Sequence, residues 1–305
     1  MKNRGPMKAM ILAAGFGTRL QPLTNYKPKA LMPVANRPMI ARVIDYLKNF
    51  GVREILVNAH HHADQLINYL DKGRPFGINI EIRREPEILG TGGGIKNSSG
   101  FWDPEPFIVI NSDILTNIPL DRAYADHLKT ENLASLILHD LKDHSRILID
   151  ADNTILDISP ENQPDRLSFT GIHILNPAIL DYIPSGRFYH IMDTYRELIQ
   201  TGKKLKAHVA KGHYWYDIGS IDNYKKANIG LATNFPEISL NSRIEPGVHF
   251  KDWAIIGTQC VVEQDARIVQ SILWDHTHVK KGCRIIDSIV TGTKTVEKDL
   301  IKTVY

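Results

Sequence analysis

The sequence is poor in cysteine, carries little net charge and contains no long apolar run. It has two cysteines in 305 residues, Cys260 and Cys283, which excludes a fold held together by several disulfides. The net charge of +3 comes without a long basic run, so we do not expect binding to nucleic acid. No apolar run approaches the ~18 residues that span a membrane, so we do not expect a membrane partner.

The N-terminus shares only part of the pattern of a signal peptide. Lys2, Arg4 and Lys8 accompany an apolar run from Ala9 to Ala14. That run is shorter than the ~7–15 apolar residues of a signal peptide core, and a glycine turn with an arginine follows it. We therefore expect a cytoplasmic protein whose first strand lies near residue 7.

Strand-like and helix-like segments alternate from residue 7 to about residue 235. Apolar residues at spacings of three and four predict helices over 38–50, 63–71 and 192–202. Apolar or alternating segments predict strands over 8–14, 53–59, 78–85, 106–113, 133–140 and 167–175. This order predicts an α/β domain over residues 1–235, with a Rossmann-like, mostly parallel sheet covered by helices. In such sheets, ligands bind at the carboxyl ends of the strands.

A different period begins after residue 235. Apolar residues recur every six positions, and a second apolar series lies four positions further on. The first series is Ile244, Phe250, Ile256, Val262, Ile268 and Trp274, and after a one-residue slip it continues with Val279 and Ile285. A period of six predicts a short left-handed β-helix over residues 236–305, with roughly two to three triangular coils. A small irregular β domain is the alternative. So short a stack is expected to pack on the first domain or on another subunit of a homo-oligomer.

The segment after the first strand contains Gly15, Gly17 and Arg19. Two glycines allow a tight turn whose free N–H groups can bind an anion. A dinucleotide fingerprint would need a third glycine where Leu20 stands, and a P-loop string does not occur. A loop that cradles a nucleoside triphosphate and supplies its own cations is the third interpretation. On the two glycines alone, a plain turn with a surface arginine is the simplest interpretation.

The longer string "LAAGFGTRLQPLTNYKPKALMPVANRPMI", residues 12–40, closely resembles the signature of the sugar-1-phosphate nucleotidylyltransferases. These enzymes join a nucleoside triphosphate to a sugar 1-phosphate and release pyrophosphate. The matching positions are Leu12, Ala13, Ala14, Gly15, Gly17, Thr18, Arg19, Leu20, Pro22, Leu23, Thr24, Pro28, Lys29 and Pro33. The resemblance extends over nearly the whole chain and includes mannose-1-phosphate guanylyltransferases and N-acetylmuramate-1-phosphate uridylyltransferases. Many members also carry a hexapeptide tail.

The resemblance implies a role for each matching residue. Arg19 would hold the β- and γ-phosphates, and Lys29 would stabilise charge that grows near the α-phosphate. The implied nucleotide-binding residues are Leu12, Ala13, Ala14, Gly15, Gly17, Thr18, Gly90, Thr91 and Ser112. Thr170 and Gly171 match the sugar-binding strand. On sequence alone, the glycine-rich string around Gly90 and Thr91 could also be only a flexible loop.

Two aspartates are candidate metal ligands. Asp113 ends an apolar strand, and Asp217 lies among aromatic residues in "YWYDIGS". Hard oxygen ligands on separate strands suit Mg²⁺, and the resemblance implies that these two carboxylates hold it. The alternative for each aspartate is a helix N-cap.

Two departures from the family pattern concern the substrates. The usual Gly-Asp pair is Ser112-Asp113 here, and the lysine that grips the sugar phosphate is missing from "SPENQPDRLSFTG". Arg166 is a candidate substitute. We expect GTP with mannose 1-phosphate or a related sugar as substrates. A UTP-dependent enzyme of the glucose or N-acetylmuramate type, or a non-catalytic subunit that senses nucleotide sugars, are the alternatives. Retention of Arg19, Lys29, Asp113 and Asp217 argues against the sensor.

Overall fold

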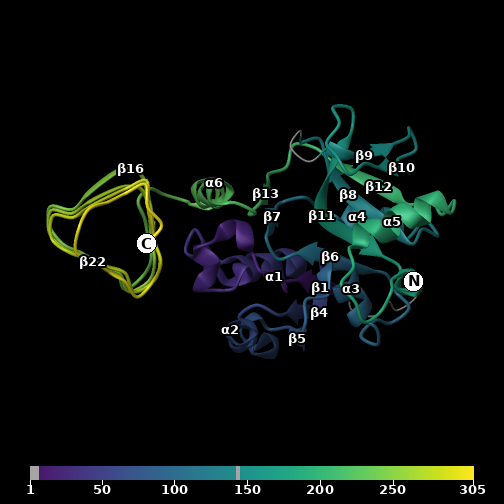
Figure 1. Ribbon diagram of the computed structural model, residues 1–305, viewed down its shortest axis with the longest axis horizontal. Coiled ribbons are helices and arrows are strands. Elements are labelled where there is room, and N and C mark those ends of the chain that lie inside the picture. The colour runs from purple at the N-terminus through teal and green to yellow at the C-terminus, as the bar shows by residue number, and fades with distance from the viewer. Residues whose placement is uncertain (1–6, 142–144) are drawn as a thin grey trace. The chain divides into compact units, whose positions relative to one another are not determined.

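The computed structural model describes residues 7–141 and 145–305. These residues form two compact units (Figure 1). The first, here called the sheet unit, contains residues 7–16 and 40–217 apart from 142–144. The second, here called the β-helix unit, contains residues 17–39 and 218–305. The domain boundary expected at residue 235 stays a prediction.

The sheet unit is built on a nine-stranded mixed sheet. Seven strands follow the order β10-β9-β11-β6-β1-β4-β5, while β8 pairs with β11 and β12 pairs with β8. The strands are β1 (Met7–Leu12), β4 (Val52–Ala59), β5 (Asn79–Arg84), β6 (Phe107–Asn111), β8 (Ala134–His139), β9 (Ser145–Ile149), β10 (Ile155–Ile158), β11 (Leu167–Leu175) and β12 (Lys206–Ala210). Strands β6, β1, β4 and β5 are parallel to one another, and β11 is antiparallel to its neighbours. The predicted α/β fold is confirmed.

Helices accompany the sheet, and three of them lie where the spacing of apolar residues is helical. They are α1 (Met39–Asn49), α2 (Ala63–Leu70), α3 (Gly90–Asn97), α4 (Leu120–His127), α5 (Ile191–Gln200) and, in the β-helix unit, α6 (Ile221–Leu231). The three predicted helices correspond to α1, α2 and α5. Central strand residues such as Met10, Leu56 and Val109 are fully buried in one cluster with Leu198 of α5. Strands covered in this way read as continuous apolar runs, which explains the sequence of β1 and β6.

Two further sheets have two strands each. In the sheet unit, β7 (Ile114–Thr116) pairs antiparallel with β13 (Trp215–Asp217). In the β-helix unit, β2 (Pro33–Val34) pairs antiparallel with β3 (Arg37–Pro38). No helix within residues 7–141 or 145–305 has the length and apolar character needed to cross a membrane.

The C-terminal part of the β-helix unit consists of short parallel strands in a three-sided stack (Figure 1). Its strands are β14 (Glu237–Ile238), β15 (Arg243–Ile244), β16 (His249–Ile256), β17 (Val261–Val262), β18 (Arg267–Leu273), β19 (His278–Val279), β20 (Arg284–Ile286), β21 (Ile289–Val290), β22 (Thr295–Val296) and β23 (Leu300–Ile301). Val262, Ile268, Val279 and Ile285 are fully buried in one core, as the period of six predicts. The parallel strands are compatible with the expected short β-helix.

The stack is longer than the two to three coils expected from the sequence. One of its sheets contains four strands in register, β15, β17, β19 and β22. The apolar series counted in the sequence begins at Ile244 and fades after Ile289, so it misses β14 at one end and β22 and β23 at the other. Val290 and Val296 are six positions apart and buried, but a further one-residue shift takes them out of the counted series.

Candidate active site

Buried polar side chains join the carboxyl ends of three parallel strands in the sheet unit. The N–H of Ala13, directly after β1, donates to Oδ1 of Asn58 in β4 (2.7 Å). Nδ2 of Asn58 donates to Oε1 of Glu85, which follows β5 (2.7 Å), and Oε2 of Glu85 accepts the N–H of Leu89 (3.1 Å). Asn58 and Glu85 are only 3% and 1% exposed. This bridge fixes the start of the glycine loop against the start of α3.

Sequence reasoning missed both Asn58 and Glu85. The available signal was their position, because each polar residue stands where an apolar or alternating strand ends. A buried amide and a buried carboxylate at strand ends need hydrogen-bond partners, so they could have been paired with one another. Neither residue belongs to a glycine or cation signature, so no motif points to them.

The glycine-rich segment is the helix α3, so the alternative of a flexible loop there is wrong. The N–H groups of Gly92 and Gly93 in α3 both donate to Tyr189 O (2.8 and 3.2 Å). A Cβ on Gly92 would lie 2.9 Å from Cδ1 of Tyr189, and one on Gly93 would lie 2.7 Å from Arg187 O. The glycines therefore allow a second segment of chain to approach the helix closely. Thr91 takes part, because its Oγ1 accepts the N–H of Ile191 (3.0 Å).

The pairing of β7 with β13 places the two aspartates at adjoining positions of the backbone. Asp217 is the last residue of β13 and pairs with Ile114, the residue directly after Asp113. Both side chains are half-buried. Neither caps a helix: a strand follows Asp113, and the N-cap of α6 is Ser220, whose Oγ accepts the N–H of Asn223 (3.2 Å). The capping alternative is therefore wrong for both residues.

The expected sugar-binding residues lie in β11 beside these strands. Gly171 has φ +77°, and a Cβ there would lie 2.8 Å from Nδ2 of Asn111 at the end of β6. Thr170 is fully buried and its hydroxyl donates to Ile137 O (2.8 Å), while its carbonyl accepts Nε1 of Trp215 (2.9 Å). The glycine thus lets two strands approach closely, and the sugar-binding role of Thr170 and Gly171 stays a prediction.

The other expected nucleotide-binding residues of the sheet unit lie around the end of β1. Ala13 and Ala14 are buried, whereas Gly15 is exposed. Leu12 O accepts the N–H of Ser112, the residue after β6 (3.0 Å). The expected nucleotide residues of the sheet unit therefore lie at the ends of two neighbouring parallel strands and in the first turn of α3.

In the β-helix unit, Lys29 packs against Gly17. Gly17 has φ +66°, and a Cβ there would lie 2.8 Å from Cγ2 of Thr24 and 3.4 Å from Cβ of Lys29. The Thr24 hydroxyl donates to Gly17 O (3.1 Å). Lys29 begins the 3₁₀ helix η3 (Lys29–Leu31) and is half-buried. The second glycine of the loop is thus needed both for its backbone conformation and for the close approach of Thr24, with Lys29 packed beside it.

Arg19 lies in the neighbouring 3₁₀ helix η1 (Thr18–Leu20) and is exposed. A Cβ on Gly219 would lie 2.9 Å from Nη2 and 3.1 Å from Cζ of Arg19. The guanidinium therefore lies against bare backbone just before α6. The structure thus brings Lys29 to Gly17, Arg19 to Gly219, and Asp113 to Asp217. The convergence of the cations with the carboxylates stays a prediction.

The donor set at β7 and β13 fits a divalent ion whose coordination the substrate completes. Within the described residues, no group of three or more His, Cys, Asp or Glu side chains is placed to hold a metal. Mg²⁺ commonly takes only one or two protein carboxylates and fills the other positions with water and phosphate oxygens. Asp113 and Asp217 supply that number of carboxylates.

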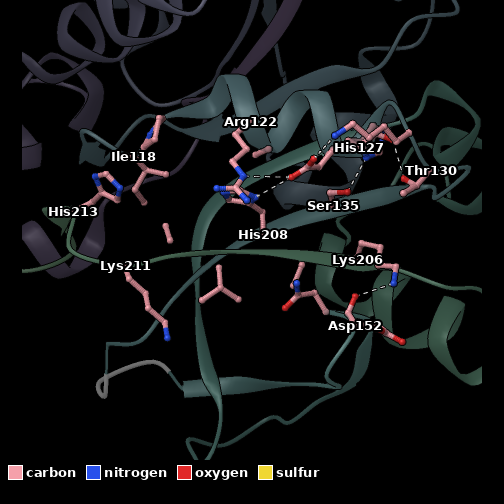
Figure 2. A pocket seen from close by; sticks show the side chains of 18 residues that line it. Ile118, Arg122, His127, Thr130, Ser135, Asp152, Lys206, His208, Lys211 and His213 are labelled. Atoms are coloured by element: carbon pink, nitrogen blue, oxygen red, sulfur yellow. Dashed lines mark hydrogen bonds and ion pairs between the residues drawn. The ribbon is translucent and has the colours of Figure 1, made fainter.

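A separate cavity of about 670 Å³ lies in the sheet unit between α4 and β12 (Figure 2). Acidic and basic side chains line it together: Asp126 lies 3.9 Å from Arg122 and 4.0 Å from His208. His127 is buried beside Ser135 (2.8 Å), and burial lowers the pKa of His127 to about 4. None of the expected site residues is among the described residues that line this cavity.

Comparisons with known proteins identify the family of the chain. The family model described as nucleotidyl transferase matches residues 8–234. A probable mannose-1-phosphate guanylyltransferase 2 from Arabidopsis thaliana is 31% identical over 95% of this chain and 87% of its own length. An N-acetylmuramate alpha-1-phosphate uridylyltransferase from Neisseria meningitidis is 34% identical over 72% of this chain and 96% of its own length.

A crystal structure of HddC from Yersinia pseudotuberculosis, complexed with GMP-PN, has a similar fold. Its TM-score is 0.62 at 28% identity, and the likeness covers 73% of this chain and 99% of that one. The family match spans most of the chain, and both relatives share 30% identity or more. The chain belongs to the nucleotidyl transferase family, among the sugar-1-phosphate nucleotidylyltransferases.

Proposed function

We propose that this enzyme transfers a nucleoside monophosphate from GTP to mannose 1-phosphate or a related sugar 1-phosphate. The observation that carries the proposal is the register of β7 and β13, which pairs Asp217 with Ile114, the residue directly after Asp113. Two aspartates at adjoining positions of one strand pair suit a reaction of phosphates that needs a divalent ion. The family of the chain supplies the reaction class.

The reaction is attack by a phosphate oxygen of the sugar phosphate on the α-phosphorus of the triphosphate, with pyrophosphate as the leaving group. The two substrates together carry roughly six negative charges, so positioning and charge neutralisation dominate the barrier. In this proposal, Arg19 holds the β- and γ-phosphates that depart. Lys29 stabilises the charge that grows around the α-phosphate in the transition state.

Asp113 and Asp217 are the proposed ligands of Mg²⁺, which would neutralise phosphate oxygens when bound. Replacing either carboxylate by its amide removes a charge and keeps the shape. We expect Asp113→Asn and Asp217→Asn to raise the magnesium concentration needed for half-maximal activity by about tenfold or more. Asp181→Asn, at an exposed position, is the control. Unchanged magnesium titrations in both variants would remove these residues from the metal site.

The choice of GTP over UTP rests on the names of similar proteins. The Arabidopsis relative is named a guanylyltransferase, and the solved structure of HddC carries GMP-PN. The Neisseria relative is named a uridylyltransferase and supports the alternative, a UTP-dependent enzyme acting on N-acetylmuramate 1-phosphate or glucose 1-phosphate.

A pyrophosphate-release assay over a panel of nucleoside triphosphates and sugar 1-phosphates tests the proposal. We expect release with GTP and mannose 1-phosphate to exceed release with every UTP pair. Preference for a UTP pair would replace the proposed substrates by the alternative. No release with any pair, from protein that is folded and supplied with Mg²⁺, would favour a non-catalytic sensor of nucleotide sugars.

A homo-oligomer that associates through the β-helix unit remains part of the proposal. Short stacks of coils leave strand edges at both ends, which favours packing on a further surface. Sedimentation velocity of the full chain measures the subunit number, and a monomer at assay concentration would contradict it.

A further inference from the structure

The segment that carries Lys29 belongs to the same compact unit as the C-terminal coils. This segment, residues 17–36, is here called the cationic loop and contains Arg19 and Lys29. Its regular structure is limited to three-residue 3₁₀ helices and the two-residue strand β2. Such short pieces do not hold a conformation by their own hydrogen bonds. The contacts that hold the loop must therefore come largely from outside it.

The first outside contact is a hydrogen-bond relay from the coils through α6. Nε1 of Trp274 donates to the hydroxyl of Tyr224 (2.9 Å), and that hydroxyl donates to Pro33 O (2.5 Å). Trp274 is 1% exposed and Tyr224 is fully buried. An indole N–H can only donate and a carbonyl can only accept, so the hydroxyl has one arrangement that satisfies both neighbours. Burial also raises the pKa of Tyr224 well above its usual value, which keeps the hydroxyl proton in place.

The next turn of α6 and one coil hold the residues after Pro33. Oδ1 of Asn228 accepts the N–H of Ala35 (2.9 Å), and its Nδ2 donates to Tyr224 O (2.9 Å). Nδ2 of Asn36 donates to Ile256 O at the end of β16 (3.0 Å). Asn228 is fully buried, so the Ala35 bond is shielded from water.

Two cation–π contacts join the earlier part of the loop to the coils. Nζ of Lys27 lies 5.5 Å from the centre of the Trp274 ring. Nζ of Lys294, from the last coils, lies 5.4 Å from the Tyr26 ring. Lys29 is thus flanked by contacts to the coils on both sides along the chain. A displacement of the coils would be transmitted to the lysine from both directions.

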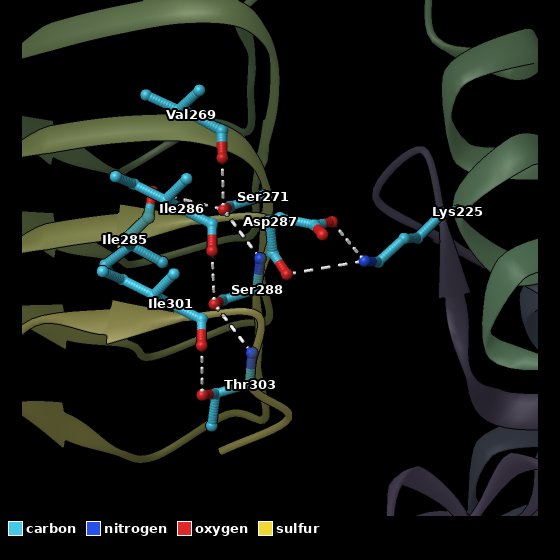
Figure 3. A network of polar contacts seen from close by, with 9 residues as sticks. All are labelled: Lys225, Val269, Ser271, Ile285, Ile286, Asp287, Ser288, Ile301 and Thr303. Atoms are coloured by element: carbon cyan, nitrogen blue, oxygen red, sulfur yellow. Dashed lines mark hydrogen bonds and ion pairs between the residues drawn. The ribbon is translucent and has the colours of Figure 1, made fainter.

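Helix α6 is itself tied to the coils, as Figure 3 shows. Nζ of Lys225 lies 2.5 Å from Oδ1 of Asp287. Behind that turn, hydroxyls of successive coils form a ladder: the Ser271 Oγ accepts the N–H of Ser288, and the Ser288 Oγ accepts the N–H of Thr303 (both 3.1 Å). The ladder keeps the coils in register where α6 is attached. The coils, α6 and the cationic loop are therefore connected by named bonds.

We propose that Tyr224 and Trp274 are positioning residues, through which the C-terminal coils hold Lys29 in the conformation needed for nucleotidyl transfer. The inference rests on the proposed function for the role of Lys29. It gives the coils a part in the catalytic step itself, in addition to any association between subunits. A small displacement of a positioned group is enough to slow a reaction strongly.

Tyr224→Phe tests the relay because it removes one oxygen and leaves the ring. We expect kcat to fall about tenfold, since a lysine displaced by less than 1 Å stabilises the transition state less well. KM for the triphosphate should change by no more than about twofold, because the lost interaction belongs to the transition state. Tyr124→Phe is the matched control: the Tyr124 hydroxyl also donates to a proline carbonyl, Pro106 O (2.7 Å), but in the sheet unit.

Trp274→Phe removes the same relay from its other end and serves if Tyr224→Phe does not fold. The double variant should be no slower than the slower single variant by more than about twofold, because the two residues act in series. If the two single reductions in kcat multiplied fully in the double variant, the relay would be excluded. A kcat in Tyr224→Phe equal to that of Tyr124→Phe would also exclude it.

Hydrogen–deuterium exchange gives a readout that does not depend on activity. In Tyr224→Phe, amides of residues 30–36 should exchange at least about fivefold faster than in the parent, as expected when local opening becomes easier. They should not do so in Tyr124→Phe. Unchanged exchange in both relay variants would overturn the inference. Faster exchange in a protein whose parent releases no pyrophosphate would overturn the proposed function and leave the relay established as a structural brace.

Discussion

The two pairs of charged residues expected in the reaction are held by different kinds of structure. In the sheet unit, Asp217 ends β13 and Asp113 directly precedes β7, so the backbone pairing of these two strands constrains both positions. In the β-helix unit, Arg19 and Lys29 lie in short 3₁₀ helices, so packing and side-chain contacts set their positions. A ladder of backbone bonds tolerates substitution of its side chains, whereas a brace made of side chains does not.

The comparison separates substitutions that remove a charge from those that only move it. A carboxylate on a strand end stays in place when its neighbours change. A lysine in a short loop keeps its charge but loses its position when a distant hydroxyl is removed. The following variants test this difference, beginning with the one of largest expected effect.

Lys29→Ala removes one cation outright. We expect kcat to fall by ~10²–10³, the usual cost of losing one donor that acts in the transition state. Steady-state kinetics with saturating triphosphate and sugar 1-phosphate measure it. Lys203→Ala, at an exposed position, is the control for loss of a positive charge. A near-parental kcat in Lys29→Ala would exclude the lysine from the mechanism, and with it the contrast between the two pairs.

Asn58→Asp tests the side-chain bridge between Asn58 and Glu85 in the sheet unit. It replaces a donor by a second carboxylate opposite Glu85, which is 1% exposed. Two buried carboxylates this close cannot both be ionised, so one pKa of the pair rises. The variant's free energy of unfolding should fall by ~3 kcal/mol at pH 8 relative to the parent, as measured by urea denaturation.

The loss of stability in Asn58→Asp should depend on pH. A carboxyl whose pKa is raised in the folded state supports folding at low pH, and that support is lost as pH rises through the raised pKa. The deficit of Asn58→Asp should therefore grow from roughly pH 5 to pH 8. The double variant Asn58→Asp with Glu85→Gln restores one donor opposite one carboxylate and should recover most of the stability. A deficit that does not change with pH would show that the two side chains do not face one another as described.

The sequence predicted most elements that depend on local periodicity. Helices α1, α2 and α5 and the inward residues of the coils follow from spacings within about ten residues, which is the range over which a repeat can be read. Helix α3 was not predicted, because four of its first five residues are glycine, a poor helix former. Its formation depends on the close approach of residues 187–191, which no local pattern reports.

Some residues of the candidate site could be predicted from the sequence, and others could not. Arg19, Lys29, Asp113 and Asp217 were found because a long family signature contains them, and their roles remain predictions. The relay through Tyr224 could not be found, because its hydroxyl meets a carbonyl 191 positions away in the sequence. Asn58 and Glu85 lie between these cases: their position after strands was visible, but which partners they meet depends on the order of strands in the sheet.

Gly219→Ala has the smallest expected effect and moves a cation without removing it. The new Cβ would lie 2.9 Å from Nη2 of Arg19, at the flexible end of that side chain. The guanidinium can shift at little cost in folding, so the free energy of unfolding should change by less than about 1 kcal/mol. Its displacement should lower kcat/KM for the triphosphate by about tenfold, a fraction of the loss expected from removing the cation. In Gly219→Ala combined with Arg19→Ala, the alanine at 219 should add nothing further, because the group that it displaces is gone. A further fall in kcat/KM in that double variant would mean that Gly219 acts through a group other than Arg19. The position of Arg19 would then depend less on packing than the contrast with Asp113 and Asp217 requires.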